Sequence, residues 1–219
     1  MRLAESFLSI NGEGLYVGYL AHFIRLSGCI LKCSYCDTAW AQDSKVGTET
    51  NPEALLDLLE DSPVKHVTLT GGEPLASKGV MDFIKEVLEK TDMELEIETS
   101  GGVALKPFID AFGSDSRLHF TVDYKLPSSL MQGNMIPENY PLLRKGDVVK
   151  YVIGTEEDLQ KAIDHLSSWQ SEATPIFSPI YGKMEASRLV EMVKDKALSQ
   201  VRVQLQLHKY IWDPNLQGV

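Results

Sequence analysis

The 219-residue chain has only three cysteines, and all of them lie within eight residues, at Cys29, Cys33 and Cys36. A structural zinc site takes four protein ligands, so with no fourth cysteine it would need a distant histidine. A disulfide framework fits poorly, because no cysteine elsewhere is available as a partner, and we expect a reducing compartment such as the cytoplasm. The incomplete set points to a metal cofactor with an open coordination position.

Long apolar runs and basic residues are also scarce. No stretch approaches the length of a transmembrane span, and the first residues lack the apolar region of a signal peptide. There are 21 Lys and Arg against 31 Asp and Glu, a formal net charge of −10. This balance argues against a nucleic acid or membrane partner, because phosphate binding uses clustered basic residues. With 43% hydrophobic residues, the chain is expected to be a soluble enzyme with a small substrate, in a single domain spanning residues 1–219.

Strand and helix patterns alternate along the chain, without a Rossmann glycine fingerprint. About seven such units favour a curled barrel over an open doubly wound sheet. A complete eight-unit barrel needs ~250 residues, so we predict an α/β fold that is a partial, open-sided (β/α) barrel. One long irregular connection, residues 126–147, is expected near the active site. The predicted strands are 21–26, 64–70, 94–99, 118–123, 148–153, 175–178 and 201–207, with helices starting near 51, 80, 108, 155 and 185.

The unusual motifs follow these strands, where barrel enzymes gather their active-site residues. In the last predicted strand, apolar and polar residues alternate, so one polar face could point into the barrel mouth and bring His208 to the substrate. We therefore expect one mouth to hold every motif. The motifs are the cysteine segment, Thr70 to Pro74, Glu98 to Gly102, Asp123 to Lys125, Ser178 with Pro179, and His208 with Lys209.

The C-x3-C-x2-C spacing, with Tyr35 before Cys36, resembles the signature of the radical S-adenosylmethionine enzymes. A 4Fe-4S cluster held by three thiolates leaves one iron open. The resemblance implies that this iron binds the amino acid end of S-adenosylmethionine. One electron passed to the sulfonium then releases a 5′-deoxyadenosyl radical, so the cofactor supplies the difficult chemistry.

The Gly71-Gly72-Glu73 segment resembles the GGE motif of the same enzymes. Glycine lets a backbone approach a ligand closely, and Glu73 or nearby carbonyls could accept hydrogen bonds from an ammonium group. Taken alone, the segment could equally be a turn into a helix with Glu73 at its N-terminus. The expected contacts of S-adenosylmethionine are Tyr35 at the adenine, Ser100 at the ribose, and Cys36, Asp37, Gly72, Glu73, Asp123, Tyr124 and Lys125.

Local patterns narrow the resemblance further. Residues 5–14, residues 23–29, the Cys36-Asp37-Thr38 segment and residues 204–209 together are similar to the 7-carboxy-7-deazaguanine synthase family, over most of the chain. The resemblance implies a lyase that contracts the ring of 6-carboxy-5,6,7,8-tetrahydropterin to 7-carboxy-7-deazaguanine, with loss of ammonia, for queuosine biosynthesis. It also implies a homodimer, and an electron donor such as flavodoxin or ferredoxin.

The substrate carries a carboxylate and a guanine-like edge. Arg25 could pair with the carboxylate through its forked donors, and Glu13 could accept from the N–H groups of the edge. Alternatively, Arg25 pairs with a buried acid and Glu13 is a solvated loop residue. Asn11 stands where the family commonly has Gln, which leaves its role open. The expected substrate contacts are Ile10, Asn11, Gly12, Glu13, Arg25, Thr70 and His208.

Thr38 is expected to bind Mg²⁺, which in the family holds the substrate carboxylate and which prefers oxygen ligands. A helix-capping pair of Asp37 and Thr38 is the alternative. Two other functions stay open: an activase of a glycyl-radical enzyme, and a non-catalytic zinc or electron-transfer protein. The segment around Glu13 and the strand with Arg25 weigh against the activase, since both supply polar groups for a small molecule. Whether Lys125 and Lys150 contact ligands or only acids is undecided from sequence.

Overall fold

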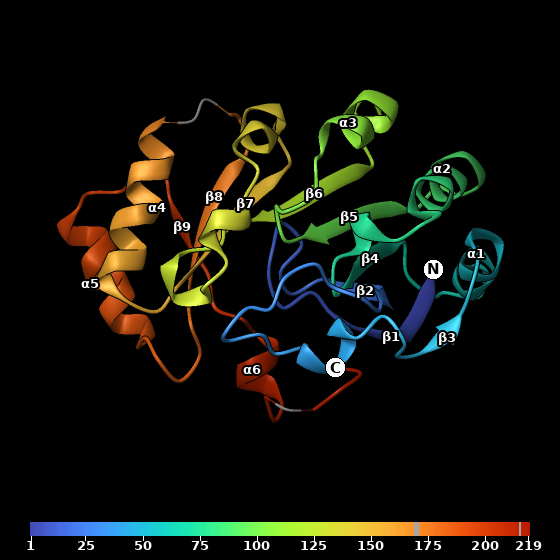
Figure 1. The fold of residues 1–219 in the computed structure, drawn as a ribbon, viewed down its shortest axis with the longest axis horizontal. Coiled ribbons are helices and arrows are strands. Elements are labelled where there is room, and N and C mark those ends of the chain that lie inside the picture. The colour runs from blue at the N-terminus through green and yellow to red at the C-terminus, as the bar shows by residue number, and fades with distance from the viewer. Residues whose placement is uncertain (169–170, 215) are drawn as a thin grey trace.

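The computed structural model describes residues 1–168, 171–214 and 216–219. Within these residues, nine strands form one sheet in the order β3-β1-β2-β4-β5-β6-β7-β8-β9. From β2 onward the neighbours in this order are parallel, whereas β1 runs antiparallel to both β2 and β3. The sheet curls without closing, which confirms the partial, open-sided barrel (Figure 1). Its strands are β1 (Arg2–Ile10), β2 (Leu20–Leu26), β3 (Thr48–Glu49), β4 (His66–Gly71), β5 (Glu94–Thr99), β6 (Leu118–Asp123), β7 (Val148–Ile153), β8 (Thr174–Pro179) and β9 (Arg202–Val203).

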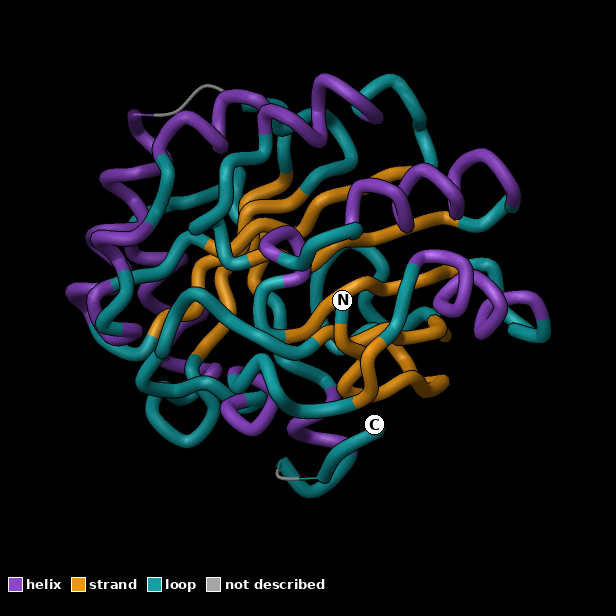
Figure 2. Tube along the Cα trace, turned by 45° about the vertical axis from the view of Figure 1, so that its right-hand side comes forward, coloured by secondary structure: helices purple, strands orange, loops and turns teal. Residues whose placement is uncertain are grey.

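Helices lie along the convex outer side of the curved sheet (Figures 1 and 2). This arrangement follows from connectivity, because parallel neighbours need a crossover and the crossover helix covers the sheet face. The last short helix lies away from the outer row, beside the cysteine segment (Figure 1). The helices are α1 (Pro52–Glu60), α2 (Val80–Lys90), α3 (Lys106–Phe112), α4 (Glu156–Ser168), α5 (Ala186–Asp195) and α6 (His208–Ile211).

The predicted starts of α1 and α4 are confirmed by capping bonds. Asn51 Oδ1 accepts from the Ala54 amide at 2.8 Å, directly before Pro52 at the first helical position, which satisfies a donor that the helix itself leaves unpaired. At α4, the Asp158 amide donates to Thr155 Oγ1 and the Thr155 amide donates back to Asp158 Oδ2, both at 3.1 Å. The predicted apolar stripe of α2 is buried as a whole: Val80, Phe83, Ile84, Val87 and Leu88.

The connection from β6 to β7 contains short 3₁₀ helices, at Pro127–Ser129, Gln132–Asn134 and Pro137–Leu142. It is held against the cysteine segment, because the Ser34 amide donates to the Ser129 carbonyl at 3.1 Å and Ser34 Oγ donates to the Ser128 carbonyl at 2.5 Å. The expectation of an irregular loop beside the site is therefore confirmed.

The last predicted strand, 201–207, was too long, since pairing with β8 ends at Val203. The side chains of the polar residues that follow Val203 bind the loop after β1. Gln204 Oε1 accepts from the Gly14 amide at 2.8 Å, and its Nε2 donates to the Gly14 carbonyl at 3.0 Å. Gln206 Nε2 donates to Glu13. These bonds take the chain out of the sheet and across the barrel end.

A carboxyl group is buried in the barrel interior, at Glu96 on β5, which is 1% exposed. Its Oε1 accepts from Thr121 Oγ1 at 2.6 Å. Burial, and next the charge of Glu98, raise the pKa of Glu96 from 4.5 to about 8. Near neutral pH the group is therefore mostly the protonated acid.

The raised pKa gives a testable dependence of stability on pH. Between 4.5 and about 8 the folded state binds more protons at Glu96 than the unfolded chain does, so this group's contribution to stability falls as pH rises. Half-buried histidines with lowered pKa, such as His165 at about 4, act in the opposite direction, but they are common to wild type and variant. As the pH rises from 5 to 8, the unfolding free energy of the Glu96→Gln variant should increase relative to that of wild type by up to about 3 kcal/mol.

Urea unfolding of both proteins across this pH range measures that difference. The matched control is Glu60→Gln, on the exposed end of α1, whose difference from wild type should stay constant with pH. Parallel curves for Glu96→Gln and wild type would show that Glu96 is ionised in the folded protein.

Candidate active site

A cavity of about 370 Å³ lies at the end of the barrel where β2, β4, β5 and β6 lead into their loops. This volume is within the ~300–1,000 Å³ range of small-molecule sites. The expectation of one shared mouth is confirmed for every motif except Ser178 with Pro179, which do not line this cavity. The sequence-predicted residues in its wall are Ile10, Gly12, Glu13, Arg25, Cys29, Cys33, Tyr35, Cys36, Asp37, Thr38, Thr70, Gly72, Ser100, Asp123, Lys125 and His208.

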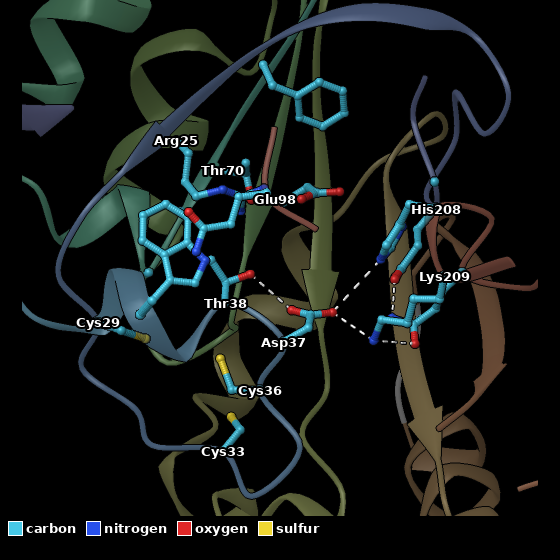
Figure 3. Close-up of a pocket in the computed structure, with 18 of the residues that line it drawn as sticks. Arg25, Cys29, Cys33, Cys36, Asp37, Thr38, Thr70, Glu98, His208 and Lys209 are labelled. Carbon is cyan, nitrogen blue, oxygen red and sulfur yellow. Dashed lines mark hydrogen bonds and ion pairs between the residues drawn. The ribbon is translucent and has the colours of Figure 1, made fainter. Parts of the chain in front are cut away.

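The three cysteines are half-buried free thiols in one part of this wall, and Figure 3 shows their side chains gathered on the same side of the pocket. Burial raises the pKa of the Cys29 and Cys33 thiols, a cost that coordination to a metal would reverse by favouring the thiolate. Three soft sulfur donors with no competing disulfide fit the iron-sulfur cluster that the spacing predicts.

The backbone around Cys29 is fixed from two sides. The Gly28 amide donates to the Ala41 carbonyl at 2.8 Å, and the Glu73 amide donates to the Gly28 carbonyl at 2.8 Å. A Cβ atom on Gly72 would lie 2.2 Å from the Gly28 carbonyl oxygen and 2.9 Å from Cys29 Cβ. Glycine at position 72 is therefore required for the β4 loop to pack against the cysteine segment.

The Glu73 carboxylate is fully engaged inside the protein, where the residue is 1% exposed. It accepts from Thr99 Oγ1 at 2.8 Å, from the Ser100 amide at 2.8 Å, from Ser100 Oγ, and from the Leu75 amide at 3.0 Å. The residue lies outside the wall of the cavity. Its side chain positions Ser100, which does line the cavity, and caps the turn at Pro74.

Two other sequence-predicted residues also lie outside the cavity wall. The Tyr124 ring stacks on His165, with centroids 3.8 Å apart. Asn11 is 1% exposed, and its Oδ1 accepts from Thr68 Oγ1 at 2.8 Å. Both side chains brace the scaffold. By contrast, Tyr35 lines the cavity, and its buried hydroxyl has no hydrogen-bond partner among the described residues.

A continuous network of ion pairs, in which positive and negative side chains alternate, crosses the cavity wall. Lys150 Nζ lies 2.5 Å from Glu13 Oε2 and 3.5 Å from Asp123 Oδ1, and Asp123 Oδ2 lies 2.6 Å from Lys125 Nζ. Although burial alone would raise them, the pKa values of Glu13 and Asp123 are lowered, in both cases by lysine charges. The pKa of Lys150 is raised well above its usual value, because the charge of Asp123 outweighs the effect of burial. These groups are therefore charged at neutral pH.

This network of ion pairs and hydrogen bonds extends through the C-terminal segment to the cysteine segment. Gln206 joins Glu13 to Lys209, whose Nζ donates to Gln206 Oε1 at 3.0 Å and to Asp37 Oδ2 at 2.7 Å. Asp37 Oδ1 in turn accepts from Thr38 Oγ1 at 3.0 Å. Figure 3 shows Asp37 between Thr38 on one side and His208 and Lys209 on the other. These bonds therefore connect the N-terminal loop that carries Glu13, the C-terminal segment that carries Lys209, and the cysteine segment.

His208 reaches this wall because Gly12 has no side chain. A Cβ atom on Gly12 would lie 2.1 Å from His208 Nδ1, and the Leu207 amide donates to the Gly12 carbonyl at 3.0 Å. His208 Nε2 lies 3.9 Å from Asp37 Oδ2. Although desolvation raises the pKa of Asp37, His208 and Lys209 hold it well below its usual range.

Arg25 pairs with an acid, as one interpretation of its sequence predicted, and this acid is the half-buried Glu5. Its Nε donates to Glu5 Oε1 at 2.7 Å, across the antiparallel pair of β1 and β2 where these residues face each other. The two terminal nitrogens make no hydrogen bond to any residue that the structure describes, and the side chain lines the cavity. A fixed guanidinium with free forked donors suits a carboxylate.

Sequence reasoning missed several residues of the wall. A signal existed for Lys150, a lone charge within the apolar strand VVKYVI, and for Glu98 at the end of β5. Gln206 was visible only as part of a polar face, and Lys209 only as the neighbour of His208 at the end of the last predicted strand. Nothing in the sequence pattern marked the segment after α6. The residues that line the cavity without having been predicted as ligand contacts are Glu5, Phe23, Leu31, Trp40, Gln42, Gly71, Glu98, Thr99, Lys150, Val152, Gln206, Lys209, Asp213, Pro214 and 216–219.

Comparisons with known proteins show the family of this chain. The Radical SAM superfamily matches residues 23–124, a range that starts on β2 and ends just after β6. A 7-carboxy-7-deazaguanine synthase of Clostridium acetobutylicum is 41% identical over 100% of this chain and 99% of its own. The chain belongs to the 7-carboxy-7-deazaguanine synthase family. A synthase of Methanospirillum hungatei is 38% identical over 98% of this chain and 86% of its own.

Solved structures share the fold. The crystal structure of QueE from Escherichia coli matches with a TM-score of 0.71 at 22% identity and covers 94% of each chain. That of SuiB from Streptococcus suis matches with a TM-score of 0.61 at 15% identity, over 83% of this chain and 48% of its own. Membership of the family implies a 4Fe-4S cluster and S-adenosylmethionine, and it does not favour the activase or the zinc protein. In the part of the chain that the structure describes, no helix is both long and apolar enough to cross a membrane.

The central ion pairs predict a large effect of removing Lys150. The Lys150→Ala variant leaves Glu13 and Asp123 buried without their shared cation, which should destabilise the fold by about 3–5 kcal/mol at pH 7. The loss should shrink at acid pH, where both carboxyls can be protonated. Chemical unfolding at pH 7 and pH 4 measures both values. Lys194→Ala, which removes an exposed pair with Glu191, is the control and should change stability little; an equally small effect for Lys150→Ala would contradict the prediction.

Proposed function

We propose that this chain is a 7-carboxy-7-deazaguanine synthase, a radical S-adenosylmethionine lyase that contracts 6-carboxy-5,6,7,8-tetrahydropterin to 7-carboxy-7-deazaguanine with loss of ammonia. The observation that carries the proposal is that three free thiols, an available guanidinium and a buried carboxylate line one cavity. The full-length similarity to curated synthases supports the same reaction.

The cofactor half of the cavity is the side of the cysteines. Cys29, Cys33 and Cys36 hold the cluster, which together with S-adenosylmethionine supplies a 5′-deoxyadenosyl radical when bound. Tyr35 offers a ring face for the adenine, and Ser100, fixed by Glu73, offers a hydroxyl for the ribose. Gly72, Asp37, Asp123 and Lys125 complete this half, and Glu73 and Tyr124 act from behind the wall.

The substrate half is the side of Arg25 and Glu13. The free terminal nitrogens of Arg25 bind the carboxylate of the pterin, and Glu13, kept ionised by Lys150, accepts from the N–H groups of its guanine-like edge. Ile10, Gly12, Thr70 and His208 form the remaining wall. Asn11 supports this wall through Thr68 and does not reach the cavity, so the shorter amide acts as a structural residue.

The proposal includes the partners that the resemblance implies. The protein works in the cytoplasm as a homodimer of single-domain subunits spanning residues 1–219. It takes electrons from a carrier such as flavodoxin or ferredoxin, and binds neither nucleic acid nor membranes. The formal net charge of −10 supports the last point, because nucleic acid and anionic lipid both attract basic surfaces.

The deciding experiment is anaerobic reconstitution with iron and sulfide, followed by incubation of the reduced protein with S-adenosylmethionine, Mg²⁺ and the tetrahydropterin. We expect 7-carboxy-7-deazaguanine by mass spectrometry without stoichiometric loss of S-adenosylmethionine. Cleavage to 5′-deoxyadenosine with the pterin left intact would keep the radical chemistry and reject the substrate. Failure to take up a cluster would instead favour the non-catalytic zinc protein.

Thr38 provides a separate test of the magnesium site. Its hydroxyl is the oxygen donor next to the cluster segment, so Thr38→Ala should abolish the dependence of turnover on Mg²⁺ and lower kcat/KM at least about tenfold, which is a loss of ~1.4 kcal/mol. Thr38→Ser keeps the hydroxyl and should retain the dependence. Titration of Mg²⁺ against turnover compares the three proteins, and identical titration curves would leave the Thr38 hydroxyl only its hydrogen bond to Asp37, since it caps no helix among the residues that the structure describes.

A further inference from the structure

The cysteine segment has two faces. Cys29, Leu31, Cys33 and Tyr35 line the cavity, whereas the residues between them, Ile30, Lys32 and Ser34, are exposed. The thiols are therefore separated from the outer surface by this one segment of the chain. On the inner side, the cofactor and substrate of the proposed function fill the cavity.

The tip of the β6–β7 connection lies beside this outer face. The Lys32 amide approaches Met131 Sδ at 3.5 Å, and the Ser34 amide donates to the Ser129 carbonyl at 3.1 Å. Between these contacts stands Leu130, with 74% of its surface exposed, the most exposed large apolar residue in the described ranges. Ile30, 52% exposed, lies against Gly102 on the same side of the connection. We call Ile30, Lys32, Leu130 and Met131 the outer patch.

The outer patch is unusual in its charge. The chain as a whole is 24% charged, yet residues 126–136 contain no charged side chain and residues 28–36 contain one, Lys32. An acidic partner would be repelled by most of a protein with a net charge of −10. At the outer patch, such a partner would meet no carboxylate from residues 28–36 or 126–136, and it would meet one exposed lysine, Lys32.

We propose that the outer patch is the docking surface for a small acidic electron-carrier protein, which reduces the cluster through the cysteine segment. This inference rests on the proposed function, which requires a one-electron donor. In the step, the reduced carrier loses one electron and the cluster gains it, and no bond or proton changes place. A small apolar centre with a single guiding charge suits the transient contacts of redox proteins, which bury little area.

The test compares two reductants on the reconstituted holoenzyme. Leu130→Glu places a like charge in the patch, and Lys32→Glu reverses its only cation; neither residue lines the cavity. With reduced flavodoxin as the probe, both variants should raise the carrier concentration needed for half-maximal turnover about tenfold. With dithionite, a small reductant that needs no docking surface, turnover should match wild type within about twofold.

Two matched variants control for charge and hydrophobicity elsewhere on the surface. Leu58→Glu on α1 and Lys161→Glu on α4 replace exposed residues of the same types and should respond to flavodoxin like wild type. The proposal is overturned if Leu130→Glu and Lys32→Glu keep the wild-type response to flavodoxin, or if they lose activity equally with both reductants. It is also overturned if either variant changes the oligomeric state in sedimentation, since the patch would then be an interface between copies.

A failure of the docking proposal can be distinguished from a failure of the proposed function. If wild type makes no 7-carboxy-7-deazaguanine with dithionite, the substrate assignment fails. The rate at which flavodoxin bleaches the visible absorbance of the cluster still tests docking in that case, with the same order of variants expected.

Discussion

The buried ion pairs around Lys150 are the constraint on which the site depends. A lysine on β7 holds a carboxylate from the N-terminal loop and another from the end of β6, in a place where an unpaired charge would be costly. Because these charges must meet, the loop after β1 has to enter the barrel end, and the segment after β9 has to follow it through Gln206. The shape of the cavity is thus set by electrostatic pairing as much as by the packing of apolar side chains beneath it.

Much of the barrel was predictable because its signals are local. The capping of α1 by Asn51 and the apolar stripe of α2 depend on neighbours a few residues away, and both were read correctly. The strand β1 was missed, since all but Ser9 of its side chains are half-buried or exposed and it shows no clear alternation. The end of β9 was overestimated because the fate of Gln204 depends on Gly14, 190 residues earlier.

The candidate site shows the same division. Cys29, Cys33 and Cys36 could be predicted to lie together because they are close in sequence, and the structure places all three in the cavity wall. The inward turn of the Glu73 carboxylate toward Ser100 was not predictable, because the same motif allows a contact with a ligand or with the next loop. Lys209 was unassigned for a similar reason: its partner, Asp37, lies on a segment that folds against it only in the complete barrel.

The backbone contacts that fix the start of the cysteine segment at Gly28 and the contacts that hold the substrate wall differ in their separation along the chain. Gly28 is bound by Ala41 and Glu73, all within the first third of the sequence, whereas Gln206 meets Glu13 across 193 residues. Closing the longer loop costs more chain entropy, so its contacts form later in folding. The backbone before Cys29 can therefore be fixed while the opposite wall, which waits for the last residues of the chain, is still open.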